Sequence, residues 1–147
     1  MKVTGRILAI DVGSRRVGLA ISDVSGTLAR PLETLVVTGG ANAVNRVVGR
    51  VDDLLLEDDG LAGIVVGLPV RLDGTPSPET ARVQAFVDAL RAKTRVAIAT
   101  EDERLTSHEA DSRLALRERD WRKRKAVLDA AAAAIILQDY LDRSPAG

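Results

Sequence analysis

The hydrophobic period of this chain first changes at the Thr-Gly-Gly break of residues 38–40, and this change constrains the fold more than any other feature. Before the break, three short apolar segments indicate strands, and their short connections favour an antiparallel meander. From Asn42 the apolar residues follow helical spacing up to the acidic segment 57–60. The chain is therefore predicted to begin with three paired strands and to continue with a helix. The three predicted strands are residues 6–11, 17–22 and 31–37.

Beyond the first helix, apolar runs alternate with helical segments. Residues 61–69 (LAGIVVGLP) form a continuous apolar run, which is typical of a strand buried on both faces. A second helix is centred on residues 83–90. This order predicts an α/β fold with a five-stranded mixed sheet, in which three antiparallel strands are followed by parallel ones, flanked by helices. The remaining predicted elements are a strand at 95–100, a third helix from Thr106 or Ser107 to about 117, and a last helix over 126–143.

Length and composition suit one domain that spans residues 1–147. The chain has no cysteine, which excludes disulfide bonds and thiolate zinc sites. No apolar run approaches the roughly 20 residues of a membrane span, so we expect a cytoplasmic protein without a membrane partner. The formal net charge is zero, which gives no indication of a nucleic acid partner. Residues 117–125, however, carry six basic and two acidic residues around the only tryptophan.

Four acidic residues stand at predicted element ends, where the sites of α/β proteins form. Asp11 ends the first strand, Asp102 and Glu103 follow the fifth, and Asp129 opens the alanine-rich last helix. Carboxylates that converge at such an edge repel one another, and a hard divalent cation such as Mg²⁺ relieves that cost. Each acid also has a purely structural interpretation. Asp11 suits an Asx turn, Asp129 a helix cap, and the pair at 102–103 a solvated loop.

Other catalytic chemistries suit the sequence less well. His108 is the only histidine, which excludes a histidine-rich metal site. Ser107 and His108 are adjacent on a predicted helix, so they point apart and make a poor nucleophile–base pair. The segment GLPVRLDGT (67–75) contains glycine but lacks the Lys-Ser/Thr of a phosphate-binding loop.

Four segments of the chain occur in a specific order, namely LAIDVGSRRVGLAISD, IVVGLPVRLDGTPS, EDERLTSHEA and VLDAAAAAIILQDYLD. Together they resemble the YqgF/RuvX family of ribonuclease-H-like proteins, whose members are named as Holliday junction resolvases and as pre-16S rRNA nucleases. The resemblance runs from about residue 6 to residue 142. Each motif alone is weak, whereas their order and spacing are specific.

The resemblance implies an acidic, metal-binding site. The family's acidic triad falls on Asp11, on the Asp102–Glu103 pair and on Asp129, and it would hold Mg²⁺ or Mn²⁺. The sequence leaves open which acid of the pair is the middle ligand, because strand register decides this.

We expect nucleic acid to contact basic residues near these acids. Arg15 and Arg16 would contact the phosphate backbone, although solubility explains them nearly as well. Arg104 would pair with a carboxylate or a phosphate at the site. Trp121 would stack on an unpaired base, or it covers the edge of the core. The cations expected to add salt-sensitive affinity by counterion release are Lys123, Arg124 and Lys125.

These expectations favour a metal-dependent endonuclease. By resemblance its substrate is precursor 16S rRNA, with branched DNA such as a Holliday junction as a second substrate. Two alternatives stay open. One is a non-catalytic RNA-binding module of ribosome assembly. The other is a nucleotide-binding phosphotransferase, which would need a second such domain or a homodimer, and a homodimer is also an open alternative for the nuclease.

Overall fold

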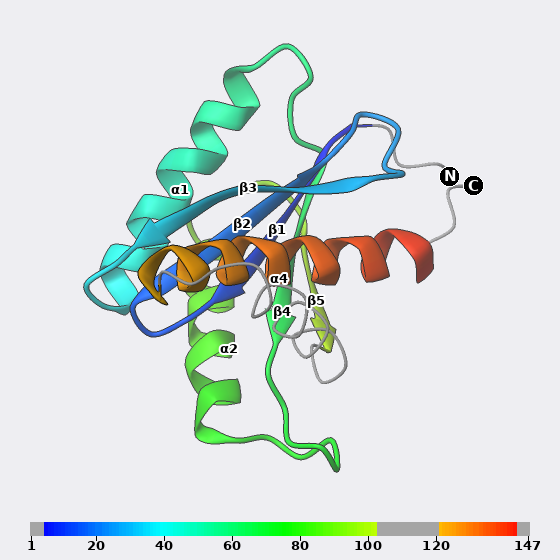
Figure 1. The fold of residues 1–147 in the computed structure, drawn as a ribbon. Helices are drawn as coiled ribbons and strands as arrows, with labels where there is room; N and C mark the ends of the chain where they lie inside the picture. The colour runs from blue at the N-terminus through cyan, green and yellow to red at the C-terminus, as the bar shows by residue number, and fades with distance from the viewer. Residues whose placement is uncertain (1–4, 103–120, 144–147) are drawn as a thin grey trace.

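The computed structural model describes residues 5–102 and 121–143, and it shows a five-stranded sheet with helices on both faces (Figure 1). The elements are β1 (Ile7–Val12), β2 (Arg16–Ser22), β3 (Ala29–Val36), α1 (Gly40–Leu56), β4 (Gly63–Leu68), α2 (Pro78–Arg91), β5 (Ile98–Asp102) and α4 (Trp121–Arg143). The strands lie in the order β3-β2-β1-β4-β5. β2 is antiparallel to both β1 and β3, whereas β4 is parallel to both β1 and β5. The predicted mixed sheet is therefore confirmed.

Different helices cover the two faces of the sheet. Because strand side chains alternate between faces, Leu8 and Ile10 of β1 join the larger core with residues of α1 and α2. Ile7 and Ala9 point the other way and pack with Ala133 of α4. Figure 1 shows α4 crossing this second face, where it contacts β1, β2 and β3. The small side chains of this face let the helix approach the sheet closely.

Two predicted boundaries are wrong in ways that affect the site. α4 begins at Trp121 rather than at residue 126, because arginine and lysine are good helix formers and no glycine or proline intervenes. Asp129 therefore lies within the helix, which excludes the capping interpretation. β5 spans Ile98–Asp102 rather than 95–100, because its pairing with β4 starts at Ile98 opposite Ile64. Asp102 is thus the last residue of the strand. The predicted third helix lies outside the described residues.

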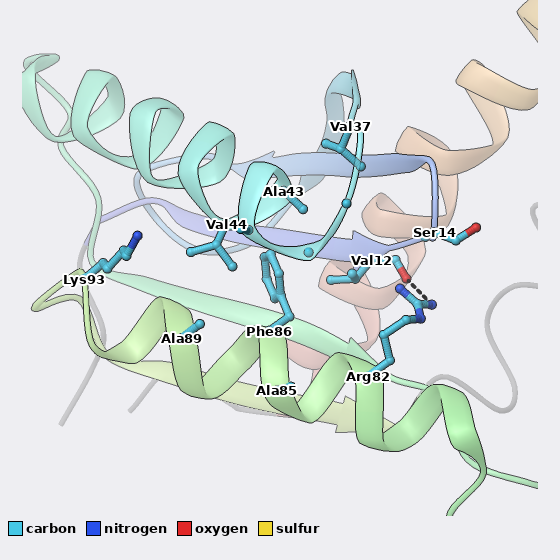
Figure 2. Close-up of a pocket in the computed structure, with 14 residues that line it drawn as sticks. Val12, Ser14, Val37, Ala43, Val44, Arg82, Ala85, Phe86, Ala89 and Lys93 are labelled. Carbon is cyan, nitrogen blue, oxygen red and sulfur yellow. Dashed lines mark hydrogen bonds between the residues drawn. The ribbon is translucent and has the colours of Figure 1, made fainter.

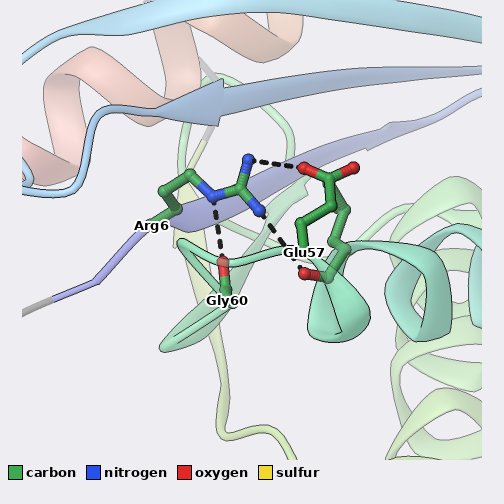
Figure 3. Close-up of polar contacts among 4 residues, drawn as sticks. Arg6, Glu57 and Gly60 are labelled. Atoms are coloured by element: carbon green, nitrogen blue, oxygen red, sulfur yellow. Dashed lines mark hydrogen bonds and ion pairs between the residues drawn. The ribbon is translucent and has the colours of Figure 1, made fainter.

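Arg6 ties the end of α1 to the start of β1 (Figure 3). Its Nε donates to the carbonyl oxygen of Gly60 at 2.9 Å, and its Nη2 donates to that of Leu54 at 3.4 Å. Its Nη1 forms an ion pair with Glu57 at 3.0 Å. A helix leaves its last carbonyl groups without helical partners, and the buried guanidinium satisfies one of them. The contact fixes α1 against the sheet at the end of β1 remote from Asp11.

Candidate active site

Asp11 lies near the C-terminal end of β1, in the strand register directly opposite Gly18 of β2. Residues that face each other across two strands direct their side chains to the same face of the sheet. Asp11 is half-buried, and Gly18, its partner on the adjacent strand, has no side chain. The register therefore leaves the space over Gly18 open to another part of the chain.

The backbone of α4 occupies that space. A β-carbon built at Gly18 would lie 2.0 Å from the carbonyl oxygen of Asp129 and 3.0 Å from the nitrogen of Ala130. Real side chains do not approach so closely, so glycine at this position permits the helix to rest on the strand. Asp129 is half-buried, and its Oδ2 atom is shielded from solvent. The backbone of Asp129 thus lies over Gly18, the residue that pairs with Asp11 on the α4 face.

The register of β5 separates the two acids at its end. Glu101 pairs with Gly67 of β4, and Asp102 pairs with Leu68. Leu68 packs against the core on the α1/α2 face, so Asp102 is directed to that face, away from Asp11. Glu101 is directed to the α4 face. Glu103 and Arg104 lie outside the described residues.

Glu101 is an acid of this face that the sequence analysis missed. Its side chain is only 10% exposed, and its Oε1 lies 2.7 Å from Nη1 of Arg143 at the end of α4. The signal that could have identified it is the alternation of β5. That alternation becomes readable only once the strand is known to start at Ile98 rather than at 95.

The two arginines of the β1–β2 turn have different places. Gly13 donates to the carbonyl oxygen of Arg16 at 2.8 Å, which closes the turn, and Val37 donates to that of Arg15 at 2.9 Å. Arg16 stands two residues before Gly18 in β2, so it is directed to the α4 face beside the acids. Arg15 is exposed at the tip of the turn. A β-carbon at Gly13 would lie 2.6 Å from the Arg16 carbonyl oxygen, so glycine serves close approach here.

The basic segment precedes Asp129 along α4. Lys125 stands four residues before Asp129, about one helical turn along the backbone. The other predicted nucleic-acid contacts, Trp121, Lys123 and Arg124, occupy the first turn of the same helix. The helix therefore leads from the basic segment to the acidic pair.

A cavity of about 540 Å³ opens on the opposite face, between the start of α1, α2 and the β1–β2 turn (Figure 2). Arg82 of α2 reaches across it and donates to the carbonyl oxygen of Val12 at 3.4 Å. Val12 alternates with Asp11 and belongs to the core of the α1/α2 face. The cavity thus lies behind the acidic pair, and Arg82 supports the turn that follows Asp11.

The donors on the α4 face suit a hard divalent cation. Asp11 and Asp129 offer carboxylate oxygens, which Mg²⁺ and Mn²⁺ prefer over nitrogen or sulfur. Among residues 5–102 and 121–143, no three acidic or histidine side chains are grouped closely enough to hold a metal ion. The described residues therefore supply two candidate ligands.

The chain is similar to known proteins over nearly all of its length. Residues 5–143 match the family model described as "RuvX: Holliday junction resolvase". A protein from Chloroflexus aggregans is 43% identical over 136 residues, covering 92% of each chain, and one from Roseiflexus sp. is 39% identical over 138 residues, covering 94% of each. Both carry the name "Putative pre-16S rRNA nuclease".

Solved structures share the fold. T. thermophilus RuvC in complex with a Holliday junction substrate superposes with a TM-score of 0.55 at 20% identity, covering 97% of this chain and 98% of that one. A second T. thermophilus RuvC structure gives a TM-score of 0.52 at 16% identity. The ribonuclease-H-like fold expected from the sequence is thereby confirmed. With a family match over nearly all of its length and relatives of this identity, the chain belongs to the RuvX family.

Proposed function

We propose that this protein is a metal-dependent endonuclease that hydrolyses phosphodiester bonds in the 5′-end maturation of precursor 16S rRNA. Membership of the RuvX family and the nuclease names of its relatives support the reaction class. The main structural support for the site is the contact of the Asp129 backbone with Gly18, which is the register partner of Asp11. Branched DNA is the second substrate, because the family model names the Holliday junction.

Asp11 and Asp129 are the proposed ligands of Mg²⁺ or Mn²⁺, with a third acid from the segment after β5. Asp102 belongs to the opposite face by register, so Glu103, the other acid of the predicted pair, is the proposed middle ligand. A divalent ion bound there would activate water and stabilise the leaving oxygen. The two carboxylates would hold the ion against the sheet, and the Oδ2 atom of Asp129 is already shielded from solvent there.

Basic residues would hold the substrate at this edge. Arg16 shares the face of the acids and would contact a phosphate oxygen, and the exposed Arg15 would add a second contact from the turn. Arg104 is proposed to pair with a carboxylate or phosphate at the site. The segment Trp121–Lys125 would guide the strand toward Asp129. Such contacts make affinity fall steeply with salt.

The test is cleavage of a precursor 16S rRNA fragment and of a four-way DNA junction, with Mg²⁺, Mn²⁺ or EDTA. Asp11→Asn and Asp129→Asn remove charge but little volume, so each should lower the cleavage rate by at least about a hundredfold while the fold persists. Asp88→Asn, at an exposed site on α2, is the matched control and should cleave normally. Wild-type rates in Asp11→Asn would show that the site assignment is wrong.

The basic residues at the start of α4 also suit a non-catalytic RNA-binding module of ribosome assembly, because they would bind RNA without any cleavage. This alternative predicts salt-sensitive RNA binding that is equal in wild type and Asp11→Asn, with no cleavage by either. Metal-dependent products from the wild type alone would exclude it.

Assembly and location are further parts of the proposal. A homodimer stays a prediction, which light scattering of the purified protein would check. No helix within the described ranges is both long and apolar enough to cross a membrane. The cytoplasm is the proposed compartment, since precursor rRNA is the proposed substrate.

A further inference from the structure

The loop between β4 and α2, residues 69–77, forms an arm at the edge of the sheet that carries Asp11. β4 lies beside β1 and runs parallel to it, so both strands end at the same edge. Figure 1 shows the arm extending from the end of β4 away from the sheet. A substrate bound along this edge would therefore meet the arm.

Hydrogen bonds within the arm fix its tip. Gly74 donates to the carbonyl oxygen of Arg71 at 2.8 Å, and Arg71 donates to that of Thr75 at 2.9 Å. The carboxylate of Asp73 accepts from the nitrogen and the hydroxyl of Thr75 at 3.0 and 2.7 Å. Gly74 has a φ of 87°, a conformation that favours glycine. The tip is thus a closed β-turn with Leu72 and Asp73 as its central residues.

Thr80 of α2 holds the base of the arm. Its buried hydroxyl donates to the carbonyl oxygen of Pro69, where the arm starts, and accepts from the nitrogen of Ser77, where it ends, at 2.8 Å. Ser77 in turn caps α2. Both ends of the arm are therefore bound to one side chain, and the tip is presented on a rigid support.

Leu72 at this tip is 83% exposed. Among the described residues only Leu56, at the end of α1, is a large apolar residue with comparable exposure, at 86%. Turn positions normally favour polar residues, glycine or proline, so formation of the turn does not require a leucine side chain at this position. An apolar side chain on a rigid projection is the chemistry that proteins use to wedge between nucleic acid bases.

We propose that Leu72 is a specificity-determining wedge that packs against an unstacked base of the nucleic acid bound at the Asp11–Asp129 edge. The proposal rests on the nuclease function proposed above and deepens it. It assigns the enzyme to substrates with an unpaired or distorted position near the cleaved bond, and a regular duplex offers Leu72 no partner. The arm contributes binding of this distorted position, and the acids retain the chemistry.

The experiment measures binding by the full-length protein in EDTA, so that no cleavage occurs. The probes are an RNA duplex with one bulged 2-aminopurine, the same duplex fully paired, and a four-way DNA junction with its linear duplex. Leu72→Ala should weaken binding to the bulged RNA or the junction by about tenfold and binding to the paired duplexes by less than about twofold. If only the bulged RNA loses affinity, the unstacked base belongs to RNA, and if only the junction loses affinity, it belongs to DNA.

Three further readouts make the test specific. Wild type should raise 2-aminopurine fluorescence, which reports unstacking, and Leu72→Ala should not. Leu72→Phe should restore both binding and fluorescence, since an aromatic ring stacks at least as well. Leu56→Ala is the matched control and should bind like wild type.

The possible outcomes distinguish a failure of the wedge proposal from a failure of the proposed nuclease function. Leu72→Ala that binds both distorted substrates like wild type overturns the wedge, and so does a loss that is equal on distorted and paired substrates. If the wild type cleaves and Leu72→Ala shows no defect in binding, the nuclease function is supported and the wedge is refuted. A wild type that binds none of the probes overturns the proposed function, and the wedge with it.

Discussion

Gly18 is the residue on which the geometry of the site depends most. It lies between the strand of Asp11 and the helix of Asp129, and the absence of its β-carbon sets how close the two acids come. Its φ is not in the left-handed region, so the requirement concerns close packing rather than backbone conformation. In the sequence, nothing distinguishes a glycine with this packing role from any other residue of a strand.

Gly18→Ala should therefore displace α4 and separate the acids. The added methyl would overlap the Asp129 carbonyl group, so the helix must move. We expect a loss of about 1–3 kcal/mol in the free energy of unfolding and a loss of about a hundredfold in cleavage rate. Urea unfolding and cleavage kinetics measure the two effects separately.

Gly49→Ala provides the control for that substitution. Gly49 is exposed on α1, and nothing lies within 4 Å of a β-carbon built there. Alanine should raise the free energy of unfolding by about 0.5–1 kcal/mol through helix propensity, with cleavage unchanged. A Gly18→Ala protein that cleaves like wild type would show that the helix contact does not position Asp129.

At the scale of elements, the β2–β3 hairpin shows how a local carboxylate organises a turn far from the site. The Asp23 carboxylate accepts hydrogen bonds from the Ser25 hydroxyl at 2.7 Å and from the backbone nitrogens of Thr27 and Leu28 at 2.7 and 3.1 Å. The bond from Ser25, followed by those from Leu28 and Thr27, lowers the pKa of Asp23 from 3.8 to about 2. The ionised form is thus the one that the folded hairpin favours.

The lowered pKa of Asp23 determines the direction in which the stability of the fold changes with pH. Because the folded pKa lies below the unfolded one, the stabilisation is complete above about pH 4 and is lost as the pH falls toward about 2. Asp23→Asn keeps an acceptor oxygen but does not titrate. The difference in melting temperature between wild type and Asp23→Asn should shrink between pH 4 and pH 2. A difference that stays constant over this window would contradict the role of the charge.

At the scale of the whole molecule, α4 is held across the sheet by contacts with residues far away in sequence. Its middle rests on Gly18, and Gln138 accepts from the nitrogen of Ala29 at 3.0 Å and donates to the carbonyl oxygen of Thr27 at 2.9 Å. Its end pairs with Glu101 through Arg143. These contacts set the path of the helix and so the position of Asp129.

The Glu101–Arg143 pair predicts an unequal response to two substitutions. Glu101 is 10% exposed and Arg143 is 58% exposed. Arg143→Met would leave a buried carboxylate without its cation and should lower the free energy of unfolding by about 1–3 kcal/mol. Glu101→Gln leaves a mostly hydrated cation and should cost less than about 1 kcal/mol. Denaturant unfolding of both variants checks this order, and an equal or reversed cost would refute it.

The sequence by itself determined the sheet. Its apolar periods and glycine breaks predict five strands, with an antiparallel meander followed by parallel strands, because the burial of one or both faces of a strand determines its local spacing of apolar residues. The same patterns place Asp11 at a strand end. The sequence could not place Asp129 or Asp102 relative to it, since a shift of one residue in register moves a side chain to the other face. Only the tertiary structure decided that Asp102 is directed away from Asp11, that Glu101 shares the face of Asp11, and that the backbone of Asp129 lies over Gly18, the residue that pairs with Asp11. Pairing between distant strands and the close approach of α4 to Gly18 set those positions, and neither is encoded in any local stretch of the chain.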